Sequence, residues 1–382
     1  MAAGDIIGSI KSNFITHILL AYILLISGFT VNFIQLLTVP LWYLGYKGLY
    51  RTCIINLNYL IWCLIPGAAQ WWADADIYIH GRPEDFDMLG KENSIAVLNH
   101  RAELDWIVSW VVAEYCNILG NAKCIAKNVL RYIPVIGWAF WFSEYIFLKR
   151  KIEEDRKRLN AGFKNLSSFE QPFWILIFCE GTRFTPEKQK TSNEFAVKNG
   201  LRPLKHHLVP RTKGFTLITQ GLRESVDMLY DATVCFRGDA ENLSVRDLLK
   251  GKRFTADFLV RRVSLDEVPI ADDECGQYVH DMYLEKDDLC EYHMNHDNFP
   301  SGVANTKYEK FISKKIPKNY WSLFFLIFWA IVCTVPLAYL TFLTLVFGSW
   351  TRTAIFTACV LTVILAYNVM LAATKPRSSY GS

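Results

Sequence analysis

Charged residues are scarce in this chain. Only 20% of the 382 residues are Asp, Glu, Lys or Arg, whereas 52% are hydrophobic, which is too apolar for soluble domains of that total length. The formal net charge is +4, and neither a long basic run nor a nucleic-acid-binding motif occurs, so no nucleic-acid partner is predicted. The composition indicates a membrane protein.

Metal and disulfide patterns are also missing. The ten cysteines include no C-x-x-C pair, so neither a zinc site nor a disulfide framework is predicted. No H-E-x-x-H or Cys/His spacing accompanies His206, His207, His280, His293 and His296. We expect these histidines to be surface or packing residues, and we predict no metal.

Four stretches contain no charged residue at all: 12–46, 52–73, 319–351 and 353–374. Each can hold the roughly 20 apolar residues that cross a bilayer core. The last two flank a short polar turn at 348–352, which predicts a transmembrane hairpin. The first is interrupted by glycine, asparagine, glutamine and proline, so it could dip into the membrane as a hairpin instead of crossing it, and the number of N-terminal crossings stays open.

Basic residues predict the orientation of the C-terminal hairpin. Its turn carries only Arg352, whereas its outer flanks carry Lys310, Lys314, Lys315, Lys318, Lys375 and Arg377. The positive-inside rule then places both outer ends, and the middle of the chain, in the cytosol. The N-x-S sequons at Asn165 and Asn242 are therefore expected to carry no glycan.

The middle of the chain alternates short β-like runs with amphipathic helical stretches, which predicts an α/β domain with a mixed sheet flanked by helices. The predicted strands are Ser94–Leu98, Phe173–Phe178, His207–Val209, Thr233–Phe236 and Phe258–Val263. The predicted helices are Glu103–Tyr115, Glu153–Leu166 and Cys275–Tyr292. The expected organisation is N-terminal membrane helices (1–72), a cytosol-facing α/β domain (73–318), a transmembrane hairpin (319–374) and a tail (375–382).

The segment Tyr132–Leu148 is apolar and rich in aromatic residues, but Pro134 and Gly137 interrupt it. It is not predicted to span the membrane. Its Trp138, Trp141 and Tyr145 would suit either a surface at the level of the lipid headgroups or ordinary core packing, and the sequence does not choose between them.

A possible catalytic pair follows the first predicted strand in the α/β domain. Asn99–Asp105 has the pattern N-H-x-x-x-x-D. His100 and Asp105 would point about 140° apart on one ideal helix, so they meet only if His100 lies in the turn before the helix. A carboxylate on one ring nitrogen would then make the other basic enough to take a proton from an attacking hydroxyl.

A second motif follows the strand predicted at Phe173–Phe178, as Cys179, Glu180, Gly181, Thr182 and Arg183. Ligand sites in open α/β sheets gather at such strand ends. The glycine lets the backbone approach a ligand, and the arginine offers a planar fork of donors that matches a phosphate. We interpret Glu180–Arg183 as a phosphate clamp, in which Glu180 would orient the guanidinium of Arg183.

These two blocks and two others resemble, in the same order, the glycerolipid acyltransferase family that includes the 1-acylglycerol-3-phosphate acyltransferases, most closely its animal subgroup with C-terminal transmembrane helices. The other blocks are Phe147–Arg150 and Leu208–Pro210. The family's usual glycine three residues before the phenylalanine is Glu144 here. This departure weakens the assignment of Arg150 but not that of Arg183.

The resemblance implies a role for each block. His100 and Asp105 would be the catalytic pair, and Glu180, Gly181, Thr182 and Arg183 would bind the phosphate of the acceptor. Arg150 would help to bind glycerol phosphate. Apart from the resemblance, the basic cluster of Lys149, Arg150 and Lys151 is itself suited to anionic headgroups or to the phosphates of CoA. Pro210 would shape the acyl or acceptor pocket.

The resemblance also implies an acyl-CoA-dependent transfer to the sn-2 hydroxyl of lysophosphatidic acid, without a cofactor, a metal or an acyl-enzyme. It implies a multi-pass protein of the endoplasmic reticulum membrane with a cytosolic active site. Protein partners, oligomeric state and acyl-chain preference are not predicted. Three alternatives stay open: another headgroup (lysophosphatidylinositol or lysocardiolipin), a non-catalytic lipid-binding scaffold, and an acyl-enzyme on Cys179.

Overall fold

The fold is described from a computed structural model, which covers residues 3–149 and 152–373. Within these residues a seven-stranded mixed sheet forms the centre of the molecule, with the strand order β3-β6-β2-β7-β8-β1-β9. The strands are β1 Asp76–Gly81, β2 Ser94–Leu98, β3 Ala122–Cys124, β6 Trp174–Ile177, β7 Met228–Phe236, β8 Thr255–Ser264 and β9 Ile312–Lys315. A separate parallel pair joins β4 Ala126–Lys127 to β5 Phe147–Leu148.

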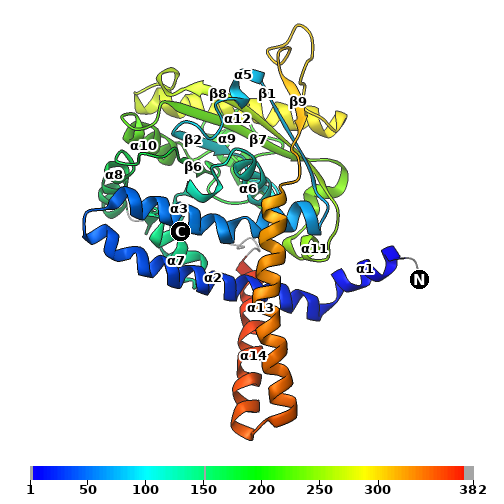
Figure 1. Cartoon of the computed structure of the whole chain (residues 1–382). Helices are drawn as coiled ribbons and strands as arrows, with labels where there is room; N and C mark the ends of the chain where they lie inside the picture. The colour runs from blue at the N-terminus through cyan, green and yellow to red at the C-terminus, as the bar shows by residue number, and fades with distance from the viewer. Residues whose placement is uncertain (1–2, 150–151, 374–382) are drawn as a thin grey trace.

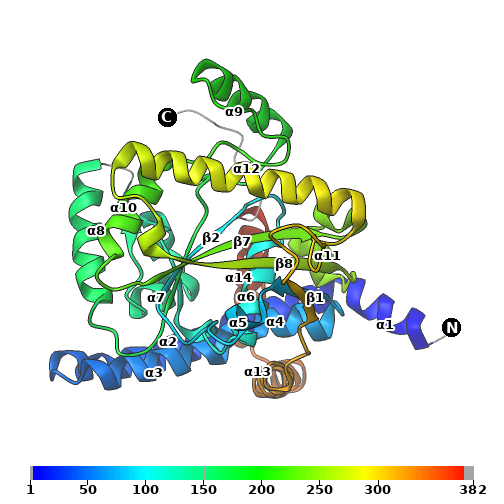
Figure 2. The same cartoon turned by 90° about the horizontal axis from the view of Figure 1, so that it is seen from above.

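Helices cover both faces of the sheet (Figures 1 and 2). The helices of the α/β domain are α5 Pro83–Phe86, α6 Asp105–Tyr115, α7 Ile136–Phe142, α8 Ile152–Leu166, α9 Pro186–Lys198, α10 Thr212–Leu222, α11 Val245–Leu249 and α12 Asp272–His296. One apolar cluster joins α8, α10 and α12 to one face, and another joins α6 to the opposite face. The α/β prediction is confirmed.

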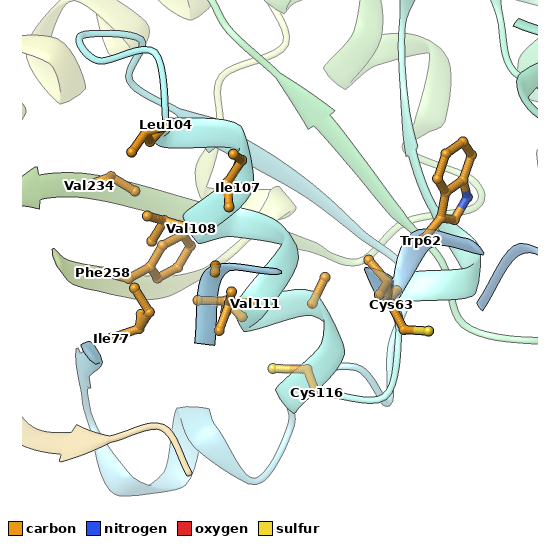
Figure 3. Packing of buried hydrophobic residues seen from close by; sticks show 14 of the residues in the cluster. Trp62, Cys63, Ile77, Leu104, Ile107, Val108, Val111, Cys116, Val234 and Phe258 are labelled. Carbon is orange, nitrogen blue, oxygen red and sulfur yellow. The ribbon is translucent and has the colours of Figure 1, made fainter. Parts of the chain in front are cut away.

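Helix α6 is anchored by its apolar side chains. Leu104, Ile107, Val108 and Val111 are buried in the same cluster as Phe258 of the sheet (Figure 3). Burying each such side chain contributes about 1.5–3 kcal/mol. Because α6 begins at Asp105, this packing also fixes the position of that carboxylate relative to the strands.

One predicted strand is wrong. Residues 207–209 form a loop, because their amide groups bond to side chains and not to a neighbouring strand: Leu208 N–H donates to Glu180 Oε2 at 3.2 Å and Val209 N–H to Ser192 Oγ at 2.8 Å. The other four predicted strands and all three helices are present, within about five residues at their ends. Strands β1 and β9, at one edge of the sheet, were not predicted.

The terminal helices are α1 Ala3–Ser12, α2 Phe14–Tyr43, α3 Lys47–Trp62, α4 Leu64–Gly67, α13 Tyr320–Phe347 and α14 Trp350–Ala373. Four segments in the described residues are long and apolar enough to cross a membrane: Phe14–Tyr43, Lys47–Trp72, Tyr320–Phe347 and Trp350–Val369. The chain is therefore a membrane protein. In Figure 1, α13 and α14 form a hairpin that projects from the domain, whereas α2 and α3 lie crosswise along its base.

Aromatic residues line the same base. Trp138 and Trp141 of α7 are 41% and 45% exposed, and the ring of Trp138 lies 5.8 Å from that of Phe29 on α2. Their exposure beside a membrane helix favours the headgroup-level interpretation for these two residues. Tyr145 differs, because its ring stacks on Phe140 at 4.2 Å and its hydroxyl donates to Ala122 O at 2.6 Å. Tyr145 is thus a packing residue.

Candidate active site

The site begins with two parallel strands that end side by side. Strand β2 pairs with β6 from Ser94 opposite Trp174 to Val97 opposite Ile177. The segments that follow these strands therefore leave the sheet on the same side, at the carboxyl ends of the strands, which is called the sheet edge below. Phe184 N–H also donates to His100 O at 2.8 Å, which joins the two predicted motifs directly.

His100 and Asp105 meet as predicted. The His100 ring lies in the turn after β2, with Nδ1 3.3 Å from Asp105 Oδ2, and Asp105 is the first residue of α6. The carboxylate is fully buried, which raises its pKa, and its contact with His100 opposes that shift. The imidazole is 23% exposed, so a substrate can reach it. With Nδ1 against the carboxylate, Nε2 is the nitrogen that can accept a proton.

Three neighbouring groups position the histidine turn. The amide side chain of Asn99 forms two hydrogen bonds with the backbone of Val234, at 2.9 and 2.8 Å, and so extends the pairing of β2 with β7. The ring of Phe178 lies 4.5 Å from the imidazole. The hydroxyl of Tyr283, on α12, donates to Leu98 O at 3.3 Å. These side chains hold the turn in place before any substrate arrives.

Glu180 does not orient Arg183, so that prediction is wrong. Its buried carboxylate accepts from His100 N–H at 2.8 Å and from Leu208 N–H at 3.2 Å. Burial is the main cause that raises its pKa, and nearby His207 opposes the rise. Glu180 therefore joins the histidine turn to the loop before Pro210. The backbone amides of both segments supply the hydrogen bonds that the buried carboxylate needs.

Arg183 pairs instead with Glu103, whose Oε2 accepts from Nη1 at 3.2 Å. Both side chains are 15% exposed. Oε1 of Glu103 accepts from Val245 N–H at 3.0 Å, so the carboxylate is itself fixed. No motif in the sequence pointed to Glu103, although it lies inside the N-H-x-x-x-x-D block.

Gly181 and Thr182 form the turn of the predicted clamp. Gly181 has a φ of +69°, in the left-handed region that favours glycine. The Thr182 hydroxyl accepts from Lys188 Nζ at 2.8 Å, and Nζ also donates to Arg183 O at 3.2 Å. Burial and the nearby Arg183 lower the pKa of Lys188. A buried ammonium thus supports the turn from beneath, and no sequence motif pointed to it.

The contacts of the other three predicted residues, Pro210, Lys149 and Arg150, do not test their predicted roles. Pro210 is buried, directly before Arg211, whose N–H donates to Cys179 O at 2.7 Å. Lys149 is exposed after β5, with its N–H bonded to Asp155 Oδ1 at 2.8 Å. Arg150 lies outside the described residues. The roles of these three residues stay predictions.

Cys179 is poorly suited to act as a nucleophile. It is buried at the end of β6, and burial raises the pKa of its thiol to about 12. The reactive thiolate would be rare at neutral pH. Within the described part of the chain, no group of three or more His, Cys, Asp or Glu side chains is arranged to hold a metal.

Two stretches of the chain match known protein families. Residues 77–226 match the acyltransferase family, and residues 247–329 match the acyltransferase C-terminus. The chain is an acyltransferase, and the matched region contains both motifs at the sheet edge.

Full-length relatives then define the family. The chain is 37% identical over 332 residues to 1-acyl-sn-glycerol-3-phosphate acyltransferase delta of Bos taurus, covering 87% of this chain and 85% of that protein. It is 38% identical over 328 residues to the gamma enzyme of Homo sapiens, covering 86% and 84%. The chain belongs to the 1-acyl-sn-glycerol-3-phosphate acyltransferase family, as its motifs predicted.

Proposed function

We propose that this protein transfers the acyl group of acyl-CoA to the sn-2 hydroxyl of 1-acylglycerol-3-phosphate and so produces phosphatidic acid. The observation that carries the proposal is the His100–Asp105 pair, which shares one sheet edge with Arg183. A general base thus stands beside a cation suited to the acceptor's phosphate. The relatives named for this substrate support the headgroup.

In the proposed mechanism the acceptor hydroxyl attacks the thioester carbonyl carbon while Nε2 of His100 takes its proton. Asp105 holds Nδ1 and stabilises the imidazolium that forms. The new C–O bond replaces the C–S bond, and the imidazolium returns its proton to the leaving CoA thiolate. No acyl-enzyme and no cofactor is needed, and acyl-CoA is a co-substrate.

An acceptor panel tests the proposal. The purified protein is given one labelled acyl-CoA with lysophosphatidic acid, lysophosphatidylinositol or lysocardiolipin, and the products are measured by mass spectrometry. We expect lysophosphatidic acid to be consumed with the highest kcat/KM. A clear preference for another lysolipid would favour the alternative headgroups, and no transfer to any acceptor would favour a lipid-binding scaffold.

We also propose that the protein resides in the endoplasmic reticulum membrane, with 319–374 as a spanning hairpin and the domain 73–318 in the cytosol. The crosswise position of α2 and α3 supports a dipping N-terminal region in 1–72 (Figure 1). Attachment of a glycan at Asn165 or Asn242 in cells would contradict this topology. Cytosolic labelling of a cysteine placed at exposed Lys190 would agree with it.

A further inference from the structure

We infer that Arg211 is a second phosphate-binding residue, which completes with Arg183 a clamp around Gly181 for the phosphomonoester of the acceptor. The inference rests on the proposed function. No motif pointed to Arg211 as a ligand, because it lies 28 residues after Arg183 in the sequence. The fold places Arg211 against Gly181, two residues before Arg183 in the chain.

The position of Arg211 follows from contacts on both sides of it. A Cβ added at Gly181 would lie 2.9 Å from Arg211 Nε and 3.2 Å from its Cζ, so the guanidinium lies directly against the glycine. The backbone of Arg211 is fixed by its bond to Cys179 O at 2.7 Å. Glycine is therefore required at 181 both for its φ of +69° and for the space that the arginine occupies.

The loop that carries Arg211 is also tied to the catalytic turn. Glu180 accepts from the backbone of both Leu208 and His100, so the two segments cannot move independently without breaking a buried contact. Arg211 itself is exposed, as is Gly181. The guanidinium thus lies at the open side of a turn whose other side is fixed to the general base.

Charge balance gives a reason for a second arginine. A phosphomonoester carries about −1.5 to −2 near neutral pH. Arg183 is paired with Glu103, so its positive charge is already offset. Lys188, beneath the turn, and Arg211, at its open side, bring two further cationic groups to the same turn. Thr182 accepts from Lys188, which leaves its own hydroxyl proton for a phosphate oxygen.

Binding of glycerol 3-phosphate, measured by calorimetry on the purified full chain, tests the clamp without turnover. Loss of a charge-assisted contact should weaken binding by about 10- to 100-fold in Arg211→Gln. Lys213→Gln, at an exposed position two residues later, is the matched control and should bind as the wild type does. Arg211→Lys should fall between them, because lysine keeps the charge but not the planar fork.

Steady-state kinetics then assign the phosphate to the acceptor. Arg211→Gln should raise the KM for lysophosphatidic acid by a similar factor and leave the KM for acyl-CoA within about twofold. Unchanged glycerol 3-phosphate binding, or a rise in the acyl-CoA KM alone, would overturn the inference. A wild type that binds glycerol 3-phosphate through Arg211 but does not acylate lysophosphatidic acid would instead refute the proposed function.

Discussion

Arg183 donates to Glu103 at 3.2 Å, while Glu180, three residues before it, turns inward to the backbone of His100. The two carboxylates therefore have separate tasks. Glu103 fixes the direction of a cation, and Glu180 fixes the position of the general base. The difference in burial agrees, since Glu180 is fully buried and Glu103 is 15% exposed.

This division predicts different kinetic defects for two equivalent substitutions. Glu103→Gln weakens the contact with Arg183 and should raise the KM for lysophosphatidic acid severalfold, with kcat nearly unchanged. Glu180→Gln points an amide NH2 at backbone N–H donors and should lower kcat by at least tenfold, because His100 shifts. Full kinetics of both variants test this. Equal KM defects with normal kcat would show that Glu180 does act through Arg183.

Arg183→Lys tests the planar fork itself. Lysine keeps the charge but cannot hold two phosphate oxygens at once, so the KM for lysophosphatidic acid should rise about tenfold or more, and that for acyl-CoA much less. Arg202→Lys is the control, because Arg202 forms an exposed pair with Asp288. A selective rise in the acyl-CoA KM would assign the clamp to the donor.

The sequence predicted those parts of the site in which a functional motif directly follows a strand. Strand β2 is predicted to the residue, because a short run that ends in four apolar residues, Ile95–Leu98, precedes the polar motif. Helix geometry showed that His100 could meet Asp105 only from the turn before the helix, and His100 does lie in that turn. Both results depend on local spacing, which the sequence contains.

Long-range contacts were not predictable in the same way. Glu103 reaches Arg183 and Val245 only after the loops have packed. The segment at 207–209 has a β-like pattern, yet it forms a loop because Glu180 and Ser192 supply its hydrogen-bond partners. Contacts with side chains distant in sequence therefore determine both the Glu103–Arg183 pair and the loop at 207–209, where a strand was predicted.

His100→Ala should lower kcat by about 10²- to 10⁴-fold, since it removes the general base. Asp105→Asn should be nearly as damaging, because an amide cannot stabilise the imidazolium and favours the wrong tautomer. Single-turnover rates with unchanged thermal unfolding would locate the defect in chemistry. His296→Ala, an exposed histidine that stacks on Tyr292, is the control. Substantial activity in pure His100→Ala would exclude the mechanism.

Glu114 should make stability depend on pH. Burial raises its pKa from 4.5 to about 7, although the Tyr59 hydroxyl donates to it at 3.1 Å. Between these values the folded protein keeps a proton that the unfolded chain loses, so the free energy of unfolding falls as pH rises from 4.5 to 7. The shift corresponds to at most about 3 kcal/mol. Glu114→Gln should remove this loss, so its stability advantage over the wild type grows across that window. An advantage that is constant with pH would contradict the prediction.

Glu144 lies at a position where the resemblance to the family implied a glycine. Its φ is +61°, a backbone conformation that glycine adopts without strain. Strain of this kind costs about 1–3 kcal/mol, so Glu144→Gly should stabilise the protein if the backbone alone mattered. However, the carboxylate forms a two-pronged pair with Arg51 of α3, with Nε to Oε1 at 2.8 Å and Nη2 to Oε2 at 3.0 Å.

The pair is mostly buried, with side-chain exposures of 6% for Arg51 and 11% for Glu144. Removing one partner of a buried pair costs about 3–5 kcal/mol, which exceeds the relief of strain. Glu144→Gly should therefore lower the thermal unfolding temperature. In Arg51→Met/Glu144→Gly no unpaired guanidinium remains, so the double variant should recover much of the loss. If Glu144→Gly alone proved more stable than the wild type, the backbone strain would outweigh this link between α3 and the acyltransferase domain.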